Sequence, residues 1–444
     1  MLKTIFNTAR LALLTSITFN ISGGAGHSKP LLTNSQATYA SACLEAYESP
    51  ERLIEICQRG LGETGASDRQ RIEMLDRLAW AQFDLGDYDQ SDKAFSEILD
   101  IDPEAEPGLQ GRAWILYQRD RYDEAADWFR KAVSRKPTAE SLSGLAASSR
   151  RSGQVDFNEY EQLMRLALSM DPEYVWGIRE LAWSLADYAR YDEALSLFRS
   201  ATDINPQDAN SEYGIAYVLS EQDAWEEAFT HITRTLELSP DSISAKSRRS
   251  LILLMLDRPK QALKDAEAVV VAWPDNSDGY VRKARALSAL DRRAEAHAVL
   301  EQAEETVGAE SYLLFWRADL LVDDYEYEAA LVQIRRSVQM EDANHFDHRL
   351  HAEIALWLNK TNEARGAINL AIEDNPNDPH ISFVDALVML SEGEYKPAEL
   401  RFDEAIKVGL PEDYLPDFLE ALVAEGRFMQ AIAMRLRYGL STQG

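Results

Sequence analysis

Residues 173–206 read EYVWGIRELAWSLADYARYDEALSLFRSATDINP, which predicts two short amphipathic helices joined by a tight turn and closed by Pro206. Small residues recur where two packed helices must touch, and large apolar residues fill the space between them. The alanine of the second helix recurs with a spacing of 34 at Ala194, Ala228, Ala262, Ala296, Ala330, Ala364 and Ala398. A fixed period of this length is typical of a repeat array and argues against independent globular domains.

The order of small, aromatic and apolar residues in this stretch resembles the tetratricopeptide repeat. The residues that carry the resemblance are Ala182, Tyr191, Ala194, Phe198, Ala201 and Pro206. Repeat ends are marked by Pro103, Pro137, Pro172, Pro206, Pro240, Pro274 and Pro376, with Gly308 and Asp342 at the two missing places. The resemblance extends over residues 37–436. It implies an all-α fold, an α-solenoid of about twelve stacked antiparallel helix hairpins in a right-handed superhelix, and a protein that binds other proteins.

The charge balance restricts the possible partners. The 444 residues include 46 basic and 75 acidic side chains, a formal net charge of −29. This charge repels nucleic acid phosphates and anionic lipid headgroups, so neither is an expected partner. Strong acidity favours either solubility alone or a basic partner.

No catalytic signal is found in the sequence. The repeats leave no stretch in which a separate catalytic domain could fold. A Gly-rich phosphate loop, a Gly-x-Ser-x-Gly motif and a calcium loop are all missing. We therefore expect no enzymatic activity, no cofactor and no metal.

The amino terminus has the pattern of an export signal. Residues 1–25 combine Lys3 and Arg10, a short apolar run and the small residues Gly23-Gly24-Ala25. This pattern predicts a cleaved signal peptide, with a disordered lead-in over 26–36 and no transmembrane segment in the mature chain. The expected location is the periplasm or the extracellular medium.

The only cysteines, Cys43 and Cys57, lie at similar distances on either side of the break at Glu48-Ser49-Pro50. Two antiparallel helices over 37–68 would bring them face to face. In an exported chain the pair should be a disulfide that staples an amino-terminal capping hairpin, contributing roughly 3 kcal/mol. In a cytosolic chain they would instead be reduced, buried thiols.

The remaining boundaries follow from the period. Residues 69–411 form the repeat array, residues 412–438 a shorter closing hairpin, and residues 439–444 a disordered tail. The third repeat of the array, residues 138–172, departs from the pattern because its turn is lengthened and Tyr160 replaces the usual alanine. Pro259 replaces the usual aromatic residue of its repeat, where it can begin a helix.

In the tetratricopeptide family the first helix of each hairpin lines the inner side of the superhelix and contacts the ligand. The position after its small residue is mostly aromatic early in the chain and charged later. The candidate partner-binding residues of the aromatic half, with their neighbours, are Trp80, Phe83, Trp114, Tyr117, Arg150, Trp176, Arg179, Trp183, Tyr213 and Tyr217. Exposed rings would anchor a ligand, whereas the alternative is that they pack as core between neighbouring helices.

The later candidates are charged. Arg285, Asp319 and Glu353, with Asp323 nearby, would form a strip suited to a basic segment, although a solvated surface explains them as well. His345, His348 and His351 are spaced three apart on one predicted helix, and a pair of them could hold a metal. Because three such residues spread widely around a helix, we interpret them as structural histidines.

The predicted function is that of a non-catalytic scaffold in the cell envelope. It would hold a partner protein or an extended peptide along the concave face of the superhelix. The alternative keeps the fold and changes the ligand: a repeat scaffold of a polysaccharide export system, whose rings contact glycan or a secretion partner.

Overall fold

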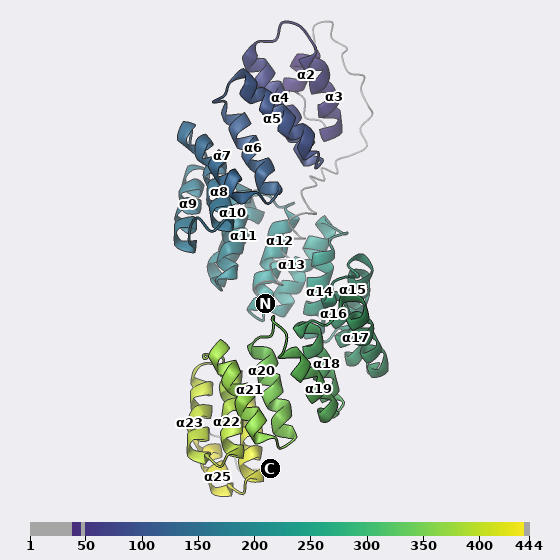
Figure 1. Cartoon of the computed structure of the whole chain (residues 1–444), viewed down its shortest axis with the longest axis vertical. Helices are drawn as coiled ribbons and strands as arrows, with labels where there is room; N and C mark the ends of the chain where they lie inside the picture. Colours follow the sequence, from purple (N-terminus) through teal and green to yellow (C-terminus); the bar gives the residue numbers. More distant parts are fainter. Residues whose placement is uncertain (1–37, 46–48, 439–444) are drawn as a thin grey trace. The chain divides into compact units, whose positions relative to one another are not determined.

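The computed structural model describes residues 38–45 and 49–438, and all regular elements in these ranges are helices (Figure 1). The predicted signal peptide, lead-in and tail lie outside the described residues. The chain divides into two compact units. We call residues 38–241 the amino-terminal unit and residues 242–438 the carboxyl-terminal unit.

In the amino-terminal unit, helices pair in antiparallel hairpins, and each hairpin packs on the next (Figure 1). Its helices are α2 (Tyr39–Glu45), α3 (Pro50–Leu61), α4 (Asp68–Asp84), α5 (Tyr88–Ile101), α6 (Glu106–Gln118), α7 (Tyr122–Arg135), α8 (Ala139–Arg151), α9 (Phe157–Met170), α10 (Val175–Asp187), α11 (Tyr191–Ile204), α12 (Ala209–Glu221) and α13 (Trp225–Leu238).

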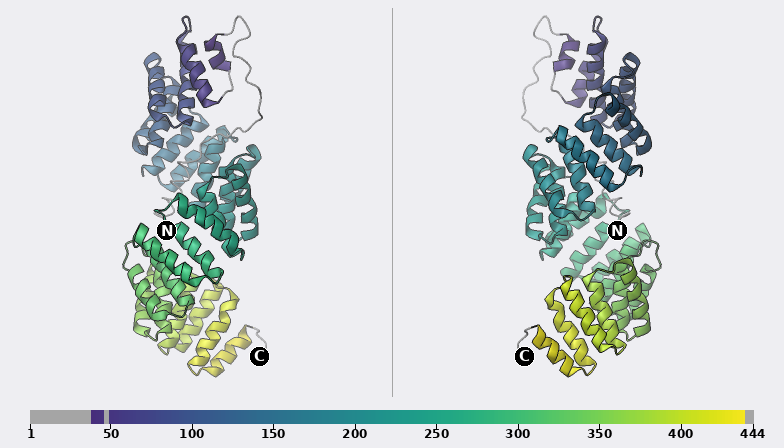
Figure 2. Two further views of the ribbon diagram at one scale, coloured as in Figure 1. Left: turned by 90° about the vertical axis from the view of Figure 1, so that its right-hand side faces the viewer. Right: turned by 90° about the vertical axis from the view of Figure 1, so that its left-hand side faces the viewer.

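The carboxyl-terminal unit repeats this arrangement, and Figure 2 shows its helices side by side from two further directions. Its elements are α14 (Ile243–Met255), α15 (Pro259–Ala272), α16 (Ser277–Ala289), α17 (Arg293–Val307), α18 (Ser311–Asp323), α19 (Tyr327–Ser337), α20 (His345–Trp357), α21 (Thr361–Asp374), α22 (Pro379–Ser391), α23 (Tyr395–Lys407), the short 3₁₀ helix η1 (Glu412–Tyr414), α24 (Leu415–Ala424) and α25 (Phe428–Arg437). The predicted fold of stacked helix hairpins is therefore confirmed within each unit.

The hairpin turns keep the 34-residue register in their backbone. Positive φ angles recur at Ala189, Asp223, Asp257, Asp291, Tyr325, Asn359 and Gly393. In these hairpins a residue in the left-handed region follows the first helix and reverses the chain. The hairpin of α8 and α9 differs, as the sequence predicted. Its turn spans residues 152–156, whereas the turns of the neighbouring hairpins span 119–121 and 188–190.

Packing between hairpins in the amino-terminal unit relies on a phenylalanine of one second helix lying on a glycine of the next first helix. Phe129 is fully buried against Gly144, and a Cβ atom at that glycine would overlap the ring. Phe95 meets Gly111 and Phe198 meets Gly214 in the same way. Each glycine is needed for close approach.

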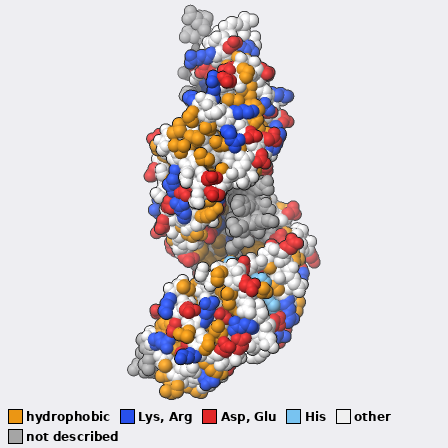
Figure 3. All heavy atoms as spheres, turned by 60° about the vertical axis from the view of Figure 1, so that its left-hand side comes forward, with side chains coloured by type: hydrophobic (Ala, Val, Ile, Leu, Met, Phe, Trp, Pro, Cys, Tyr) orange, Lys and Arg blue, Asp and Glu red, His pale blue; other side chains and the backbone are white. Residues whose placement is uncertain are grey.

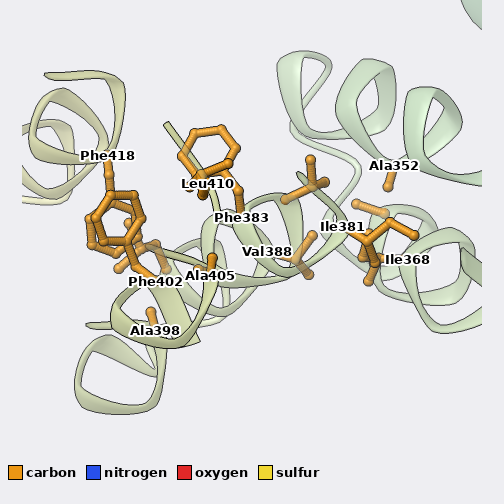
Figure 4. Close-up of a cluster of buried hydrophobic side chains, with 14 of the residues drawn as sticks. Ala352, Ile368, Ile381, Phe383, Val388, Ala398, Phe402, Ala405, Leu410 and Phe418 are labelled. Atoms are coloured by element: carbon orange, nitrogen blue, oxygen red, sulfur yellow. The ribbon is translucent and has the colours of Figure 1, made fainter. Parts of the chain in front are cut away.

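In the carboxyl-terminal unit the largest buried cluster spans α20 to α25. Figure 4 shows Phe402 of α23 lying against Phe418 of α24, and their rings stack with centroids 4.4 Å apart. Ile368, Ile381 and Ala352 are fully buried in the same cluster (Figure 4). This apolar contact holds the closing hairpin on the array.

At the start of the described chain, a disulfide joins Cys43 of α2 to Cys57 of α3, with the Cα atoms 4.8 Å apart. Both residues are fully buried beside Ile56 and Met74. The bond links the two helices of the first hairpin, where the sequence analysis expected it. Pro259 begins α15, also as expected.

Candidate functional site

The first helix of each hairpin forms a continuous row. In the amino-terminal unit α4, α6, α8, α10 and α12 contact one another in succession. In the carboxyl-terminal unit α14, α16, α18, α20 and α22 do the same. We call the exposed side of each row the first-helix face of that unit.

The aromatic candidates of the amino-terminal unit form ring clusters on these helices. Trp80 packs edge-on against Phe83 at 5.2 Å between centroids. Trp114 packs edge-on against Tyr117 of its own helix at 5.4 Å and Trp176 of α10 at 4.7 Å. The first-helix face thus joins rings from hairpins that are not adjacent in sequence.

A third ring cluster continues the face. Trp183 of α10 packs edge-on against Tyr217 of α12 at 5.3 Å and lies 5.9 Å from Tyr213. Its other side meets Phe198 of the core at 5.0 Å. One edge of the indole is therefore fixed by the fold.

Burial separates the aromatic candidates into two groups. Phe83, Trp114 and Tyr117 are at most 9% exposed and contribute to the core. The half-buried rings are Trp80, Trp176, Trp183, Tyr213 and Tyr217. Core packing thus accounts for the first group, and only the second group presents ring surface that a ligand could contact.

The arginine candidates are engaged by their own unit. Arg179 binds Asp208 at 2.7 Å, and Asp208 also caps α12. Arg150 donates to Ser184 and lies over the Tyr160 ring, 4.8 Å from its centroid. These side chains therefore brace neighbouring hairpins and offer less charge to a ligand.

Sequence reasoning missed two carboxylates on the same face. Burial raises the pKa of Asp76 to about 6, with Glu106 and Glu73 adding repulsion, and its buried Oδ1 has no hydrogen-bond partner among the described residues. Glu140 accepts a 3.2 Å bond from Trp114 Nε1, and burial raises its pKa as well. Asp76 lies one helical turn before Trp80 in the sequence, which places the two side chains next to each other on the helix. The many acidic residues of this chain made this one hard to single out.

A small pocket of about 220 Å³ opens beside Asp76, between α3 and α4. Its walls include Pro50, Leu53, Trp80 and Ala81, so an apolar surface adjoins a carboxylate. Arg77 and Asp84 complete the lining, so the pocket holds an aromatic ring, two carboxylates and one cation.

The charged candidates of the carboxyl-terminal unit also lie on its first-helix face. The guanidinium of Arg285 lies over the Trp316 ring, 4.3 Å from its centroid. Asp319 follows on the same helix as Trp316, and burial raises its pKa to about 6. Glu353 of α20 is paired with Arg349 one turn before it.

Two of the three histidines have carboxylate partners of their own, while the buried Nδ1 of His348 has no hydrogen-bond partner among the described residues. His345 Nδ1 lies 3.3 Å from Asp374, and His351 Nε2 lies 2.8 Å from Glu363. His348 is half-buried, and burial lowers its pKa. Within the described residues, no group of three His, Cys, Asp or Glu side chains is arranged to hold a metal ion.

Comparisons with known proteins agree with this geometry. A family model described as a tetratricopeptide repeat matches residues 77–140 and 179–243. No curated protein matches the sequence.

Solved structures share the fold at low identity. Yeast Tom70 is 13% identical, with a TM-score of 0.52 over 87% of this chain and 93% of that chain. A chain of the APC/C hetero-tetramer Cut9–Hcn1 is 13% identical, with a TM-score of 0.50 over 88% and 83%. A tetratricopeptide repeat protein from Parabacteroides merdae ATCC 43184 is 16% identical, with a TM-score of 0.46 over 56% and 98%. The chain therefore contains tetratricopeptide repeats at residues 77–140 and 179–243, and proteins with this repeat are generally non-catalytic scaffolds for protein interaction.

Among the described helices, none combines the length and the apolarity that crossing a membrane requires.

Proposed function

We propose that this protein is a scaffold that holds an extended, basic segment of a partner protein along its first-helix faces. The observation that carries the proposal is the set of half-buried rings on α4, α10 and α12, on the same face as the partly buried carboxylates of Asp76 on α4 and Glu140 on α8. Rings fixed on one edge and open on the other lose little entropy when a ligand packs on them. Such surfaces supply the anchors of protein interfaces.

The charge supports a basic partner. The formal net charge is −29, and Asp76 and Glu140 are partly deprived of water, with Arg77 near the former and no ion pair of either carboxylate among the described residues. Figure 3 shows acidic and basic side chains interspersed with hydrophobic ones on one face of the molecule. A cation from a ligand would restore part of the solvation that burial has removed from these carboxylates.

We further propose that the protein works in the periplasm or outside the cell. The export-signal pattern of residues 1–25 and the Cys43–Cys57 disulfide support this location, because disulfides persist in oxidising compartments. Fractionation of the native cell tests it: recovery of the uncleaved chain in the cytoplasm, with both thiols free to alkylation, would contradict the proposal.

Binding is tested by calorimetric titration of the purified chain with basic peptides from envelope proteins and, separately, with anionic polysaccharide. We expect basic peptides to bind and Trp183→Ala to weaken them by about tenfold, as loss of a central aromatic anchor does. The matched control is Trp128→Ala on the second helix α7, which should leave affinity unchanged. Binding of polysaccharide alone would favour the glycan alternative, and equal effects of both substitutions would contradict a site on the first-helix face.

A further inference from the structure

The last described hairpin, α24 with α25, ends the row of helices in the carboxyl-terminal unit, shown in yellow in Figure 2. Earlier hairpins of the unit pack on the hairpin that follows. The outer side of the last one carries exposed apolar residues, and the most exposed of them is Met429, at 77%. We call this surface the end face, and its residues are Glu420, Val423, Phe428, Met429, Ile432 and Arg435.

The register of the repeat shows that the apolar residues of the end face occupy contact positions. Counted from the residue of positive φ in the turn, Phe428 corresponds to Tyr327, whose ring lies 5.2 Å from that of Trp357 in the next hairpin. Counted in the same way, Ile432 corresponds to Arg365, which forms a 2.7 Å ion pair with α22 of the next hairpin. The end face therefore exposes positions that elsewhere in the unit touch another hairpin.

The charges of the end face are separated by helix. The charged residues of α24 are all acidic, and those of α25 are all basic. Glu420 of α24 corresponds in register to Trp183, and Arg435 of α25 corresponds to Phe198, two side chains that both contact the next first helix, α12. Neither Glu420 nor Arg435 forms an ion pair with a described residue, and the buried Nε of Arg435 has no hydrogen-bond partner in the described part of the unit.

The first hairpin of the described chain is built differently. The exposed residues of α2 and α3 are Glu45, Glu51, Gln58 and Arg59, and no large apolar residue of these two helices is exposed. A polar outer surface is what keeps a terminal repeat in solution. Exposed phenylalanine and methionine are instead typical of residues that a protein interface covers.

We infer that two copies of this chain pair through their end faces around a twofold axis, with α24 of each copy against α25 of the other. An axis parallel to the helices places Glu420 opposite Arg435 of the second copy, twice, because the two residues lie at similar distances from the turn at Gly426. The apolar residues of the two end faces then cover one another. A second copy supplies both opposite charges by symmetry, and this complementarity favours it over an unrelated partner. The inference does not depend on the proposed function.

Light scattering during size-exclusion chromatography of the full chain, over a range of concentrations, measures the pairing. We expect twice the mass of one chain at high concentration. Met429→Asp places a charge in the contact of both copies and should weaken the dimer by about hundredfold or more. The matched control is Val271→Asp on α15, because Val271 is 83% exposed but lies outside the end face, and this variant should pair like the parent chain.

A mixing experiment tests the twofold arrangement. Glu420→Arg and Arg435→Glu each place like charges opposite one another, so each variant alone should be a monomer, whereas an equal mixture of the two should form a dimer. Melting temperatures close to that of the parent chain verify that both variants fold.

A parent chain that stays monomeric at every concentration, or a dimer that survives Met429→Asp, would overturn the inference. Failure of the mixture to pair while both variants are folded would overturn the contact of α24 with α25. If Arg435→Glu prevents folding, Met429→Asp still decides, because the side chain of Met429 is mostly in solvent.

Discussion

The first-helix faces of the two units differ in how their side chains cover one another. In the amino-terminal unit, rings from three hairpins pack together and Arg179 is matched by Asp208, although Asp76 forms no ion pair among the described residues. In the carboxyl-terminal unit, Asp319 and Asp323 form no ion pair with a described residue and line a cavity together with Arg285 and Arg293. The same repeat backbone thus supports one face whose rings pack across hairpins and one face that is hollowed between two helices.

The largest expected difference concerns the tryptophans. Trp114 is 4% exposed and donates to buried Glu140, whereas Trp316 is half-buried at the cavity. Trp114→Ala should therefore lower the free energy of unfolding by about 3–5 kcal/mol, and Trp316→Ala by less. Urea denaturation followed by circular dichroism measures both. Equal losses would mean that the two faces are packed alike.

The next difference concerns the arginines. Removing Arg179 leaves the mostly buried Asp208 without its cation, and Arg179→Met should cost about 2–3 kcal/mol. Arg285→Met removes a contact with the Trp316 ring and a cation near Asp319 but breaks no ion pair, and should cost about 1 kcal/mol. The same denaturation assay compares them. A larger loss for Arg285→Met would show that this arginine carries a structural role in its unit.

The third substitution should stabilise the protein, whereas the first two pairs of substitutions should destabilise it. The pKa of Asp319 is raised to about 6 by burial, from an ordinary value of 3.8, so the folded state binds its proton more tightly than the unfolded state. Its favourable contribution is complete below pH 3.8 and is lost as the pH rises through about 6. Asp319→Asn should therefore raise the free energy of unfolding at pH 7 by about 1–2 kcal/mol, after allowance for solvent screening.

Thermal melts at pH 7 and pH 4 measure this gain, which should disappear at the lower pH. The groups that act on Asp319 are Asp323, Arg285, Glu353 and Arg349. A destabilised variant would mean that the carboxylate is matched in the folded unit.

The smallest expected effect concerns the residues with positive φ in the hairpin turns. Tyr325 adopts φ 61° and is 79% exposed, while Asn359 adopts φ 54° at the same place in the next hairpin. Because asparagine tolerates this conformation better, Tyr325→Asn should stabilise the carboxyl-terminal unit by about 0.5–1 kcal/mol. A small rise in melting temperature is expected, with Glu328→Gln unchanged as the control. No rise would mean that the tyrosine ring compensates for the strain.

Most of the fold could be predicted from the sequence because one short-range pattern recurs. The spacing from Ala194 to Ala398 fixes the hairpins, and the turn lengthened after Arg151 was visible as an extra stretch before Phe157. The expected position of the Cys43–Cys57 contact followed from the symmetry of a hairpin about its turn.

The burial and the charge pairing of the candidate site residues could not be predicted in the same way. Trp114 and Trp183 occupy the same place in their repeats and each meets a phenylalanine of its second helix, but Trp176 of α10 also packs on Trp114, which is buried. Whether a charge is matched likewise depends on the next helix, as Asp208 of α12 matches Arg179 of α10. These contacts join side chains tens of residues apart, and a repeat pattern carries no information about them.

The phenylalanine-on-glycine contacts have a consequence for how the amino-terminal unit deforms. At Gly111, Gly144 and Gly214 a buried ring from one hairpin touches the backbone of the next, so a single side chain separates the two helices there. A displacement of one hairpin should therefore be transmitted to the next hairpin with little loss. An alanine at any one of these glycines would push the ring away and widen the gap between two hairpins. Such substitutions could change the curvature of the amino-terminal unit one hairpin at a time.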